Sequence, residues 1–265
     1  MASQALPARG ARLGRAVAPG LVPVQGSVPR QRDREPGATV RAVVLALLAG
    51  DALSTRRRSP VAAAVMWPLA RHLVREGSGE GVAAHVVHYR FRGWNGGHAH
   101  PAEDAEWAVG ETVRRYGDVP VCLVGIDMGA RAALHAAGHP AVTSVVALSP
   151  WLPPGPEPEP VKQLIGRKIL IAHGTDDEST DPELSYRLAE RAKKVNRQVC
   201  RFEVHSAGHT LHPHRAEVFA LTADFVLGCL LDRPFTRPVA DALAAPPPLG
   251  LRMPLAAGFG RSLRA

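Results

Sequence analysis

The sequence predicts an α/β fold: a doubly wound, mostly parallel sheet of about six strands with helices on both faces. Strand-like and helix-like segments alternate along the middle of the chain, which is typical of parallel sheets with crossover helices. The strand-like segments are nearly unbroken apolar runs, such as VRAVVLALL at 40–48, as expected of strands buried on both faces. Hydrophobic residues make up 46% of the 265 residues and charged residues 21%, which is ordinary for a globular protein with a sizeable core.

The predicted elements follow one another with short connections. The helix expected at 101–116 begins with acidic residues and ends with two arginines, which suits the helix dipole. The interval 152–166 carries five prolines and predicts a stiff linker rather than an inserted cap domain. The predicted strands are 40–48, 81–89, 119–124, 142–148, 168–172 and 198–204, and the predicted helices are 60–76, 101–116, 128–137, 182–194 and 214–231.

Two basic tails flank the predicted domain, which covers residues 40–232. The net charge is +8, and residues 1–39 and 233–265 contribute +4 each, so the domain itself is neutral. Both tails are rich in Gly and Pro and lack apolar periodicity, which predicts disordered extensions. Beyond Phe235 and Phe259 they carry no aromatic residues between their arginines, so nucleic acid is not an expected partner.

The sequence also bears on the compartment. No apolar run reaches the ~20 residues that a bilayer-spanning helix needs, so we expect no membrane partner. Cys122, Cys200 and Cys229 lie in apolar contexts and predict buried free thiols in a reducing compartment. A cytoplasmic protein is therefore expected. The Ala, Arg, Gly and Pro bias is typical of a high-GC bacterial genome.

The turn after the third predicted strand carries the strongest functional signal. Residues 121–131 read VCLVGIDMGAR: a strand, the turn G-I-D-M-G and a helix. This is the strand–elbow–helix context of the G-x-S-x-G motif, with Asp127 where a serine is expected. Gly125 and Gly129 leave room around the strained elbow residue, and the helix directs its first amides at whatever Asp127 holds. The turn resembles the nucleophile elbow of the α/β-hydrolase superfamily, and more narrowly that of small cap-less bacterial hydrolases.

The resemblance extends over most of residues 40–231 and implies two partners for Asp127. ILIAHGTDD ends at the position of the family's acid, which gives Asp177, with Asp176 as the neighbouring alternative. The later segment SAGHTLHPH contains the family's Gly-His pair, which gives His209. Nucleophile, acid and histidine stand in the superfamily's order. The resemblance therefore implies a catalytic set of Asp127, His209 and Asp177.

Aspartate at the elbow changes the chemistry that the resemblance implies. A carboxylate can attack an sp3 carbon that bears a leaving group, and His-activated water then cleaves the ester. Epoxide hydrolases and haloalkane dehalogenases of this superfamily carry Asp there, but their cap domains supply Tyr or Trp to the leaving group. Here 152–166 is too short for a cap, and Trp94 and Asn95, after the second strand, are the candidates to replace those donors.

The loop after the first predicted strand departs from the family pattern. The family usually shows His-Gly-Gly there, whereas this chain has A-G-D at 49–51. We expect Gly50, Asp51 and Met128 to line the oxyanion or substrate pocket. Asp51 then adds a carboxylate near a site that would bind an anion. Loss of an oxyanion donor costs on the order of 3 kcal/mol in acyl transfer, whereas attack on an sp3 carbon needs no such donor in its first step. The departures fit either Asp chemistry or decay.

Other constellations predict less. The histidines at 98, 100, 209, 212 and 214 have no Cys or carboxylate at zinc-site spacing, so no metal is expected. The chain has neither a G-x-G-x-x-G nor a P-loop motif, so no cofactor is expected. His173 is expected to pack beside the acid loop. The arginine run at 56–58 is interpreted as a solvated turn, with the alternative that it recruits an acidic substrate.

Taken together, the motifs predict a cofactor-independent hydrolase acting on a small molecule. Asp127 is expected to serve as nucleophile or base, and His209 with Asp177 to activate water. The alternative is a non-hydrolytic descendant of the same fold: a pseudoenzyme, or a cyclase or lyase that uses the pocket. A binding module is a third class. Retention of His209 and Asp177 after loss of the serine favours the hydrolase.

Overall fold

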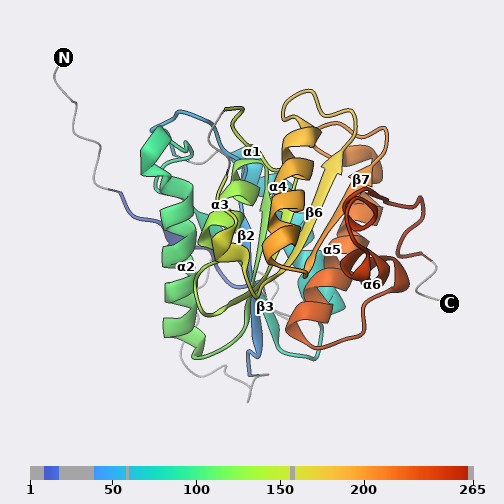
Figure 1. Ribbon diagram of the computed structural model, residues 1–265. Helices are drawn as coiled ribbons and strands as arrows, with labels where there is room; N and C mark the ends of the chain where they lie inside the picture. The colour runs from blue at the N-terminus through green and yellow to red at the C-terminus, as the bar shows by residue number, and fades with distance from the viewer. Residues whose placement is uncertain (1–8, 18–38, 58–59, 156–158, 262–265) are drawn as a thin grey trace.

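The chain is built around one eight-stranded sheet with helices on both sides (Figure 1). The computed structural model describes residues 9–17, 39–57, 60–155 and 159–261. The strand order in these residues is β1-β3-β2-β4-β5-β6-β7-β8, and the six inner strands are mutually parallel. The predicted mostly parallel sheet is confirmed. Its inner strands are β2 (Ala42–Leu47), β3 (Val82–His88), β4 (Val121–Ile126), β5 (Val142–Leu148), β6 (Lys168–Gly174) and β7 (Val199–Val204).

The apolar strands are covered on both faces, which is why they lack alternation. All six residues of β2 are buried, as are all six of β4. On one face, helices α1 and α5 pack against each other and the sheet, and α2, α3 and α4 cover the opposite face (Figure 1). The helices are α1 (Pro60–Glu76), α2 (His100–Tyr116), α3 (Met128–Ala136), α4 (Pro182–Val195) and α5 (Arg215–Leu230).

Most of the C-terminal tail, predicted to be disordered, folds onto the last inner strand. It forms α6 (Arg237–Ala244), the 3-10 turn η4 (Leu249–Leu251) and β8 (Met253–Pro254), which pairs in parallel with β7. Leu251 is fully buried, and its carbonyl accepts a hydrogen bond of 3.0 Å from the buried Arg201. The tail closes an otherwise open sheet edge, a long-range contact that leaves little periodic signal in the sequence.

Part of the N-terminal tail is likewise ordered against the opposite edge. Within residues 9–17, β1 (Arg12–Leu13) pairs antiparallel with β3, and the amide of Gly14 donates to the carbonyl of Val86 at 2.8 Å. The prediction of disorder therefore fails for this segment too, because backbone pairing with β3 satisfies its polar groups. The remaining tail residues, 1–8, 18–38 and 262–265, lie outside the described residues.

Truncating Leu251 to alanine is expected to lower the free energy of unfolding by about 2–4 kcal/mol, the usual range for a buried leucine. Leu249 lies in the same 3-10 turn but is 66% exposed, so Leu249→Ala provides a matched control with little expected effect. Urea denaturation of both variants measures the difference. Equal and small losses would mean that the tail does not pack on the sheet in solution.

The parallel strands deliver their carboxyl ends to one edge of the sheet, where ligand sites of doubly wound proteins lie. Between β5 and β6 the described residues form only the 3-10 turn η2 (Lys162–Leu164), so no cap is built from that part of the chain. Among the described helices, none is long and apolar enough to cross a membrane. The loops after β2, β4, β6 and β7 bring the candidate catalytic residues together.

Candidate active site

Asp127 occupies a strained turn between β4 and α3. Its φ of 56° and ψ of −121° lie in a region that non-glycine residues rarely adopt. The two flanking glycines make the turn possible: a Cβ at Gly125 would lie 2.2 Å from the carbonyl oxygen of Gly129, and one at Gly129 would lie 2.3 Å from that of Leu47. The G-x-D-x-G spacing is therefore a steric requirement, and it projects Asp127 beyond the strand ends.

The carboxyl group of Asp127 is held by backbone amides from two strand ends. Its Oδ2 accepts a hydrogen bond of 3.2 Å from the N–H of Gly50, directly after β2. The backbone N–H of Met128, at the start of α3, also favours the charged form of this carboxyl group and lowers the pKa of Asp127. Burial raises the pKa of Asp127, and these two amides and His209 only partly offset that rise. Gly50 cannot carry a side chain, since a Cβ would lie 2.3 Å from the Arg92 carbonyl oxygen.

His209 lies between the two carboxylates. Its Nδ1 is 2.9 Å from Oδ2 of Asp177, and its Nε2 is 3.6 Å from Oδ1 of Asp127. The first distance is a hydrogen bond in which Nδ1–H donates to the carboxylate, and the other ring nitrogen, Nε2, faces Asp127. The second is too long for a direct hydrogen bond. The side chain of His209 is 24% exposed and that of Asp127 12%, so the pair is reached from solvent.

Asp177 is buried and saturated with donors. Its Oδ1 accepts from the amides of Ser179 and Thr180 at 2.9 and 3.0 Å, and its Oδ2 from the Thr180 hydroxyl at 2.8 Å. Burial by itself raises the pKa of Asp177, but the bonds from Thr180 and His209 outweigh it and lower the pKa. Asp177 therefore stays ionised and orients His209. Asp176 is exposed and bonded to its neighbour Thr175, so the structure places Asp177 and not Asp176 on His209.

His173, at the end of β6, contacts the acid more closely than the sequence indicated. It is fully buried, with Nε2 3.1 Å from Oδ2 of Asp177 and Nδ1 2.9 Å from the Ser185 hydroxyl. Burial lowers the pKa of His173 to about 4. The imidazole is thus neutral at pH 7 and helps to fix the acid. Its place four residues before Asp177 was the only signal for this role in the sequence.

Because the folded protein binds the His173 proton more weakly than the unfolded chain does, stability is expected to fall as the pH drops below 6.5 toward 4. Between pH 7 and pH 5 this group accounts for a loss of about 2 kcal/mol. His173→Gln is expected to reduce the pH dependence by that amount, whereas the exposed His205→Gln leaves it unchanged. Urea unfolding at the two pH values measures it, and equal pH dependence in all three proteins would refute a neutral buried His173.

Two of the expected pocket residues have their polar groups engaged elsewhere. Asp51 forms an ion pair with Arg92, which compensates the extra carboxylate. Asn95 has a φ of 62°, and its side chain bridges two loops, accepting from the Ser54 amide at 2.8 Å and donating to the Ser54 carbonyl at 3.2 Å. Asn95 therefore fixes the loop that follows β3 against the loop that contains Gly50.

Trp94 packs on a residue that sequence reasoning missed. The guanidinium of Arg131, one turn along α3 from Asp127, lies 3.8 Å from the Trp94 ring centroid and 5.1 Å from that of Trp151. Arg131 also pairs with Glu159 at 2.5 Å. An arginine inside a helix after an elbow carries no sequence signature of its own. The resulting cation–π stack braces the loops beside Asp127.

The described residues contain no group of three or more His, Cys, Asp or Glu side chains placed to hold a metal ion. His98 and His100 stack on each other with ring centroids 5.2 Å apart. Of the three cysteines, all free, Cys122 and Cys200 are buried and Cys229 is half-buried.

Solved structures share this arrangement of sheet and helices. An esterase from Pyrococcus furiosus superposes with a TM-score of 0.58 at 17% identity, over 73% of this chain and 85% of the esterase. An α/β serine hydrolase without a lid from Xanthomonas campestris gives a TM-score of 0.51 at 20% identity, covering 76% of this chain and 88% of that one. The chain has the α/β-hydrolase fold. No protein-family model matches the sequence, and no curated protein matches it.

The α/β-hydrolase fold accounts for the site's position at the carboxyl ends of β4, β6 and β7. A further neighbour, a protein of unknown function from Agrobacterium tumefaciens, superposes with a TM-score of 0.54 at 14% identity, over 84% of this chain and 92% of that one. At such identities the likeness establishes the fold alone. The activity has to be argued from the residues of this site.

Proposed function

We propose that this protein is a hydrolase that attacks an sp3 carbon of a small molecule through Asp127. The observation that carries the proposal is that the two oxygens of the Asp127 carboxylate have different partners. Oδ2 accepts a hydrogen bond from the Gly50 amide, while Oδ1 faces Nε2 of His209 at 3.6 Å. A pinned carboxylate with one free oxygen is oriented for nucleophilic attack. Burial raises the pKa of Asp127, which makes its anion more reactive than that of a solvated aspartate.

In the first step, an Oδ1 lone pair of Asp127 forms a bond to the substrate carbon. The bond from that carbon to the leaving group breaks, and the leaving group departs with the electron pair. No proton needs to move when the leaving group is a halide. The product is an alkyl ester of Asp127, in which Oδ2 is the carbonyl oxygen.

In the second step, Nε2 of His209 removes a proton from water, and the hydroxide attacks Cγ of the ester. Oδ2 becomes an oxyanion next to the Gly50 amide, which already donates to this oxygen, and the Met128 amide, which favours the charged carboxylate, is the second candidate donor. Ionised Asp177 stabilises the imidazolium of His209. The bond between Cγ and Oδ1 then breaks, and the alkoxide takes the proton from His209 to leave as the alcohol. Asp127 retains the oxygen atom of the water with its second proton, which it releases to solvent to become a carboxylate again.

Oxygen labelling tests this sequence of bonds. Halide release from a panel of alkyl halides is expected from the wild-type protein and is expected to fall to background in the isosteric Asp127→Asn. In a single turnover in H2¹⁸O, the label is expected on Asp127 and not in the alcohol. Label in the alcohol would make Asp127 a general base. Inactivity of the wild type across halides and epoxides would favour the non-hydrolytic descendant.

A further inference from the structure

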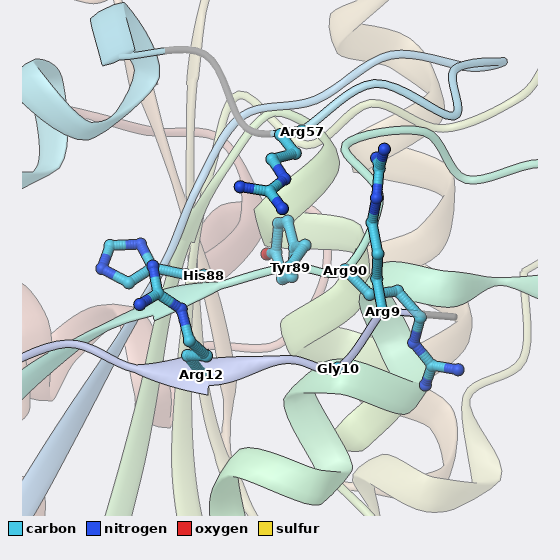
Figure 2. Close-up of a pocket in the computed structure, with 7 residues that line it drawn as sticks. All are labelled: Arg9, Gly10, Arg12, Arg57, His88, Tyr89 and Arg90. Carbon is cyan, nitrogen blue, oxygen red and sulfur yellow. The ribbon is translucent and has the colours of Figure 1, made fainter. Parts of the chain in front are cut away.

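A cavity of about 370 Å³ opens where the N-terminal segment runs along the end of β3 (Figure 2). Its wall contains three residues of the N-terminal segment, three at the end of β3 and one from the loop after β2. Figure 2 shows Arg57 next to Tyr89 in the middle of the cavity, with Arg12 and His88 to one side. No carboxylate is among the lining residues, which are Arg9, Gly10, Arg12, Arg57, His88, Tyr89 and Arg90.

The positive charge of this cavity is only partly compensated. Arg90 is neutralised, because its guanidinium bonds Asp104 at 2.6 Å and Glu103 at 3.1 Å. Arg9, Arg12 and Arg57, by contrast, are exposed and have no acidic group within ion-pair distance among the residues that the structure describes. Because these guanidinium groups are exposed, water and salt screen most of their mutual repulsion, and an anion bound between them would remove what remains of it.

Arg12 and Arg57 are placed by backbone contacts. Arg12 belongs to β1 and stands opposite His88 in the antiparallel register. The residue before Arg57 is fixed by its carbonyl, which accepts a hydrogen bond of 3.0 Å from the amide of Arg92. The loop and the N-terminal segment are also tied together, since Arg9 donates to the carbonyl of Thr55 at 3.1 Å. The backbone that carries Arg12 and Arg57 is thus fixed by hydrogen bonds and strand pairing.

The cavity lies at the same sheet edge as the elbow. Tyr89, which lines it, is buried, and burial together with the carboxylates of Asp104 and Asp127 raises its pKa. Arg57 belongs to the same loop after β2 as Gly50, whose amide donates to Asp127. A ligand group bound at Arg57 is therefore on the side of the molecule where the reaction is proposed to occur.

We propose that this cavity binds the anionic group, a phosphate or a carboxylate, of a small molecule, with Arg12 and Arg57 as its principal ligands. The planar guanidinium presents paired N–H donors that match the oxygens of either anion. Binding of the anion needs no chemistry at Asp127. The anion-binding site and the proposed hydrolase activity can therefore be tested independently of each other.

Calorimetric titration of the full chain with inorganic phosphate and, separately, with benzoate tests this assignment. Saturable binding of at least one anion is expected, and the tighter one identifies the anionic group. Arg12→Ala/Arg57→Ala is expected to weaken that binding at least tenfold. The matched control is Arg75→Ala/Arg237→Ala, which removes the same charge from side chains that are 72% and 91% exposed, on α1 and α6. It is expected to leave the affinity within a factor of two.

Three results would overturn the proposal. The wild type binds neither anion; the Arg12/Arg57 variant binds as well as the wild type; or the control variant loses as much affinity, in which case the protein responds only to net charge. Thermal melting of every variant verifies that it is folded. Asp127→Asn is expected to bind the anion unchanged, so loss of hydrolysis and loss of anion binding are read out independently.

Discussion

Asp127→Ser is expected to hydrolyse activated aryl esters at least about a hundredfold faster than the wild type, since one oxyanion donor alone is worth roughly 10²–10³ in kcat. In the wild-type site the carboxylate of Asp127 accepts a hydrogen bond from the Gly50 amide, and the Met128 amide favours its charged form. Its attack on an ester carbonyl would yield a mixed anhydride, so the wild type is expected to be barely active. Serine vacates the amides and gives His209 a hydroxyl to deprotonate.

Two variants separate this gain from incidental hydrolysis. Asp127→Ala also vacates the amides but supplies no nucleophile, and Asp127→Ser/His209→Ala supplies the nucleophile without its base. Both are expected to stay near the wild-type rate with p-nitrophenyl acetate. If Asp127→Ala is as active as Asp127→Ser, another nucleophile acts and the elbow has been misassigned. If none of the three variants is active, the Gly50 and Met128 amides do not form a working oxyanion site.

Much of the fold follows from local sequence. The strand expected at 142–148 and the helix expected at 60–76 coincide with β5 and α1, because both are long apolar or amphipathic patterns with clear ends. The turn at Asp127 could also be predicted from the sequence. A Cβ at Gly125 or Gly129 would collide with the backbone, and few turns require glycines two residues before and two residues after the same position. Elements buried on both faces and sterically forced turns leave strong signals.

The two edge strands of the sheet could not be predicted from the sequence in the same way. β1 and β8 each span two residues, and both are held by pairing with strands far away in the sequence. The composition of the tails predicts disorder, whereas the open edges of β3 and β7 offer their backbone groups to them. Leu251 illustrates the point, because its complete burial depends on α6 and β7 being in place.

Within the site, residue type and order indicated Asp127, His209 and Asp177, but not what supports them. The bond between His173 and Asp177 and the stack of Arg131 on Trp94 depend on side-chain directions that only the folded chain defines. A sequence motif identifies a candidate catalytic residue when steric constraints fix the spacing of its neighbours or when the catalytic residues follow one another in a fixed order. His173 and Arg131, which support these residues, have neither a constrained spacing nor a fixed place in the order.

His209→Ala is expected to trap the intermediate on which the account depends. Alkylation of Asp127 needs no proton transfer when a halide leaves, whereas hydrolysis of the ester needs His209 as a base. Because the nucleophile must be ionised and burial raises the pKa of Asp127, trapping is expected to slow as the pH falls through a value above the usual aspartate range. His205→Ala, an exposed control, is expected to turn over without accumulating adduct.

The decisive measurement is the intact mass of His209→Ala after incubation with a panel of alkyl halides and epoxides, followed by peptide mapping. We expect one alkyl group per chain, located on Asp127 in the tryptic peptide 116–131 and absent from Asp127→Asn/His209→Ala. That peptide also contains Cys122, whose thiol is buried and has its pKa raised by burial, so fragmentation must assign the modified residue. An adduct on Cys122, or no adduct from any substrate that the wild type hydrolyses, would contradict a nucleophilic Asp127.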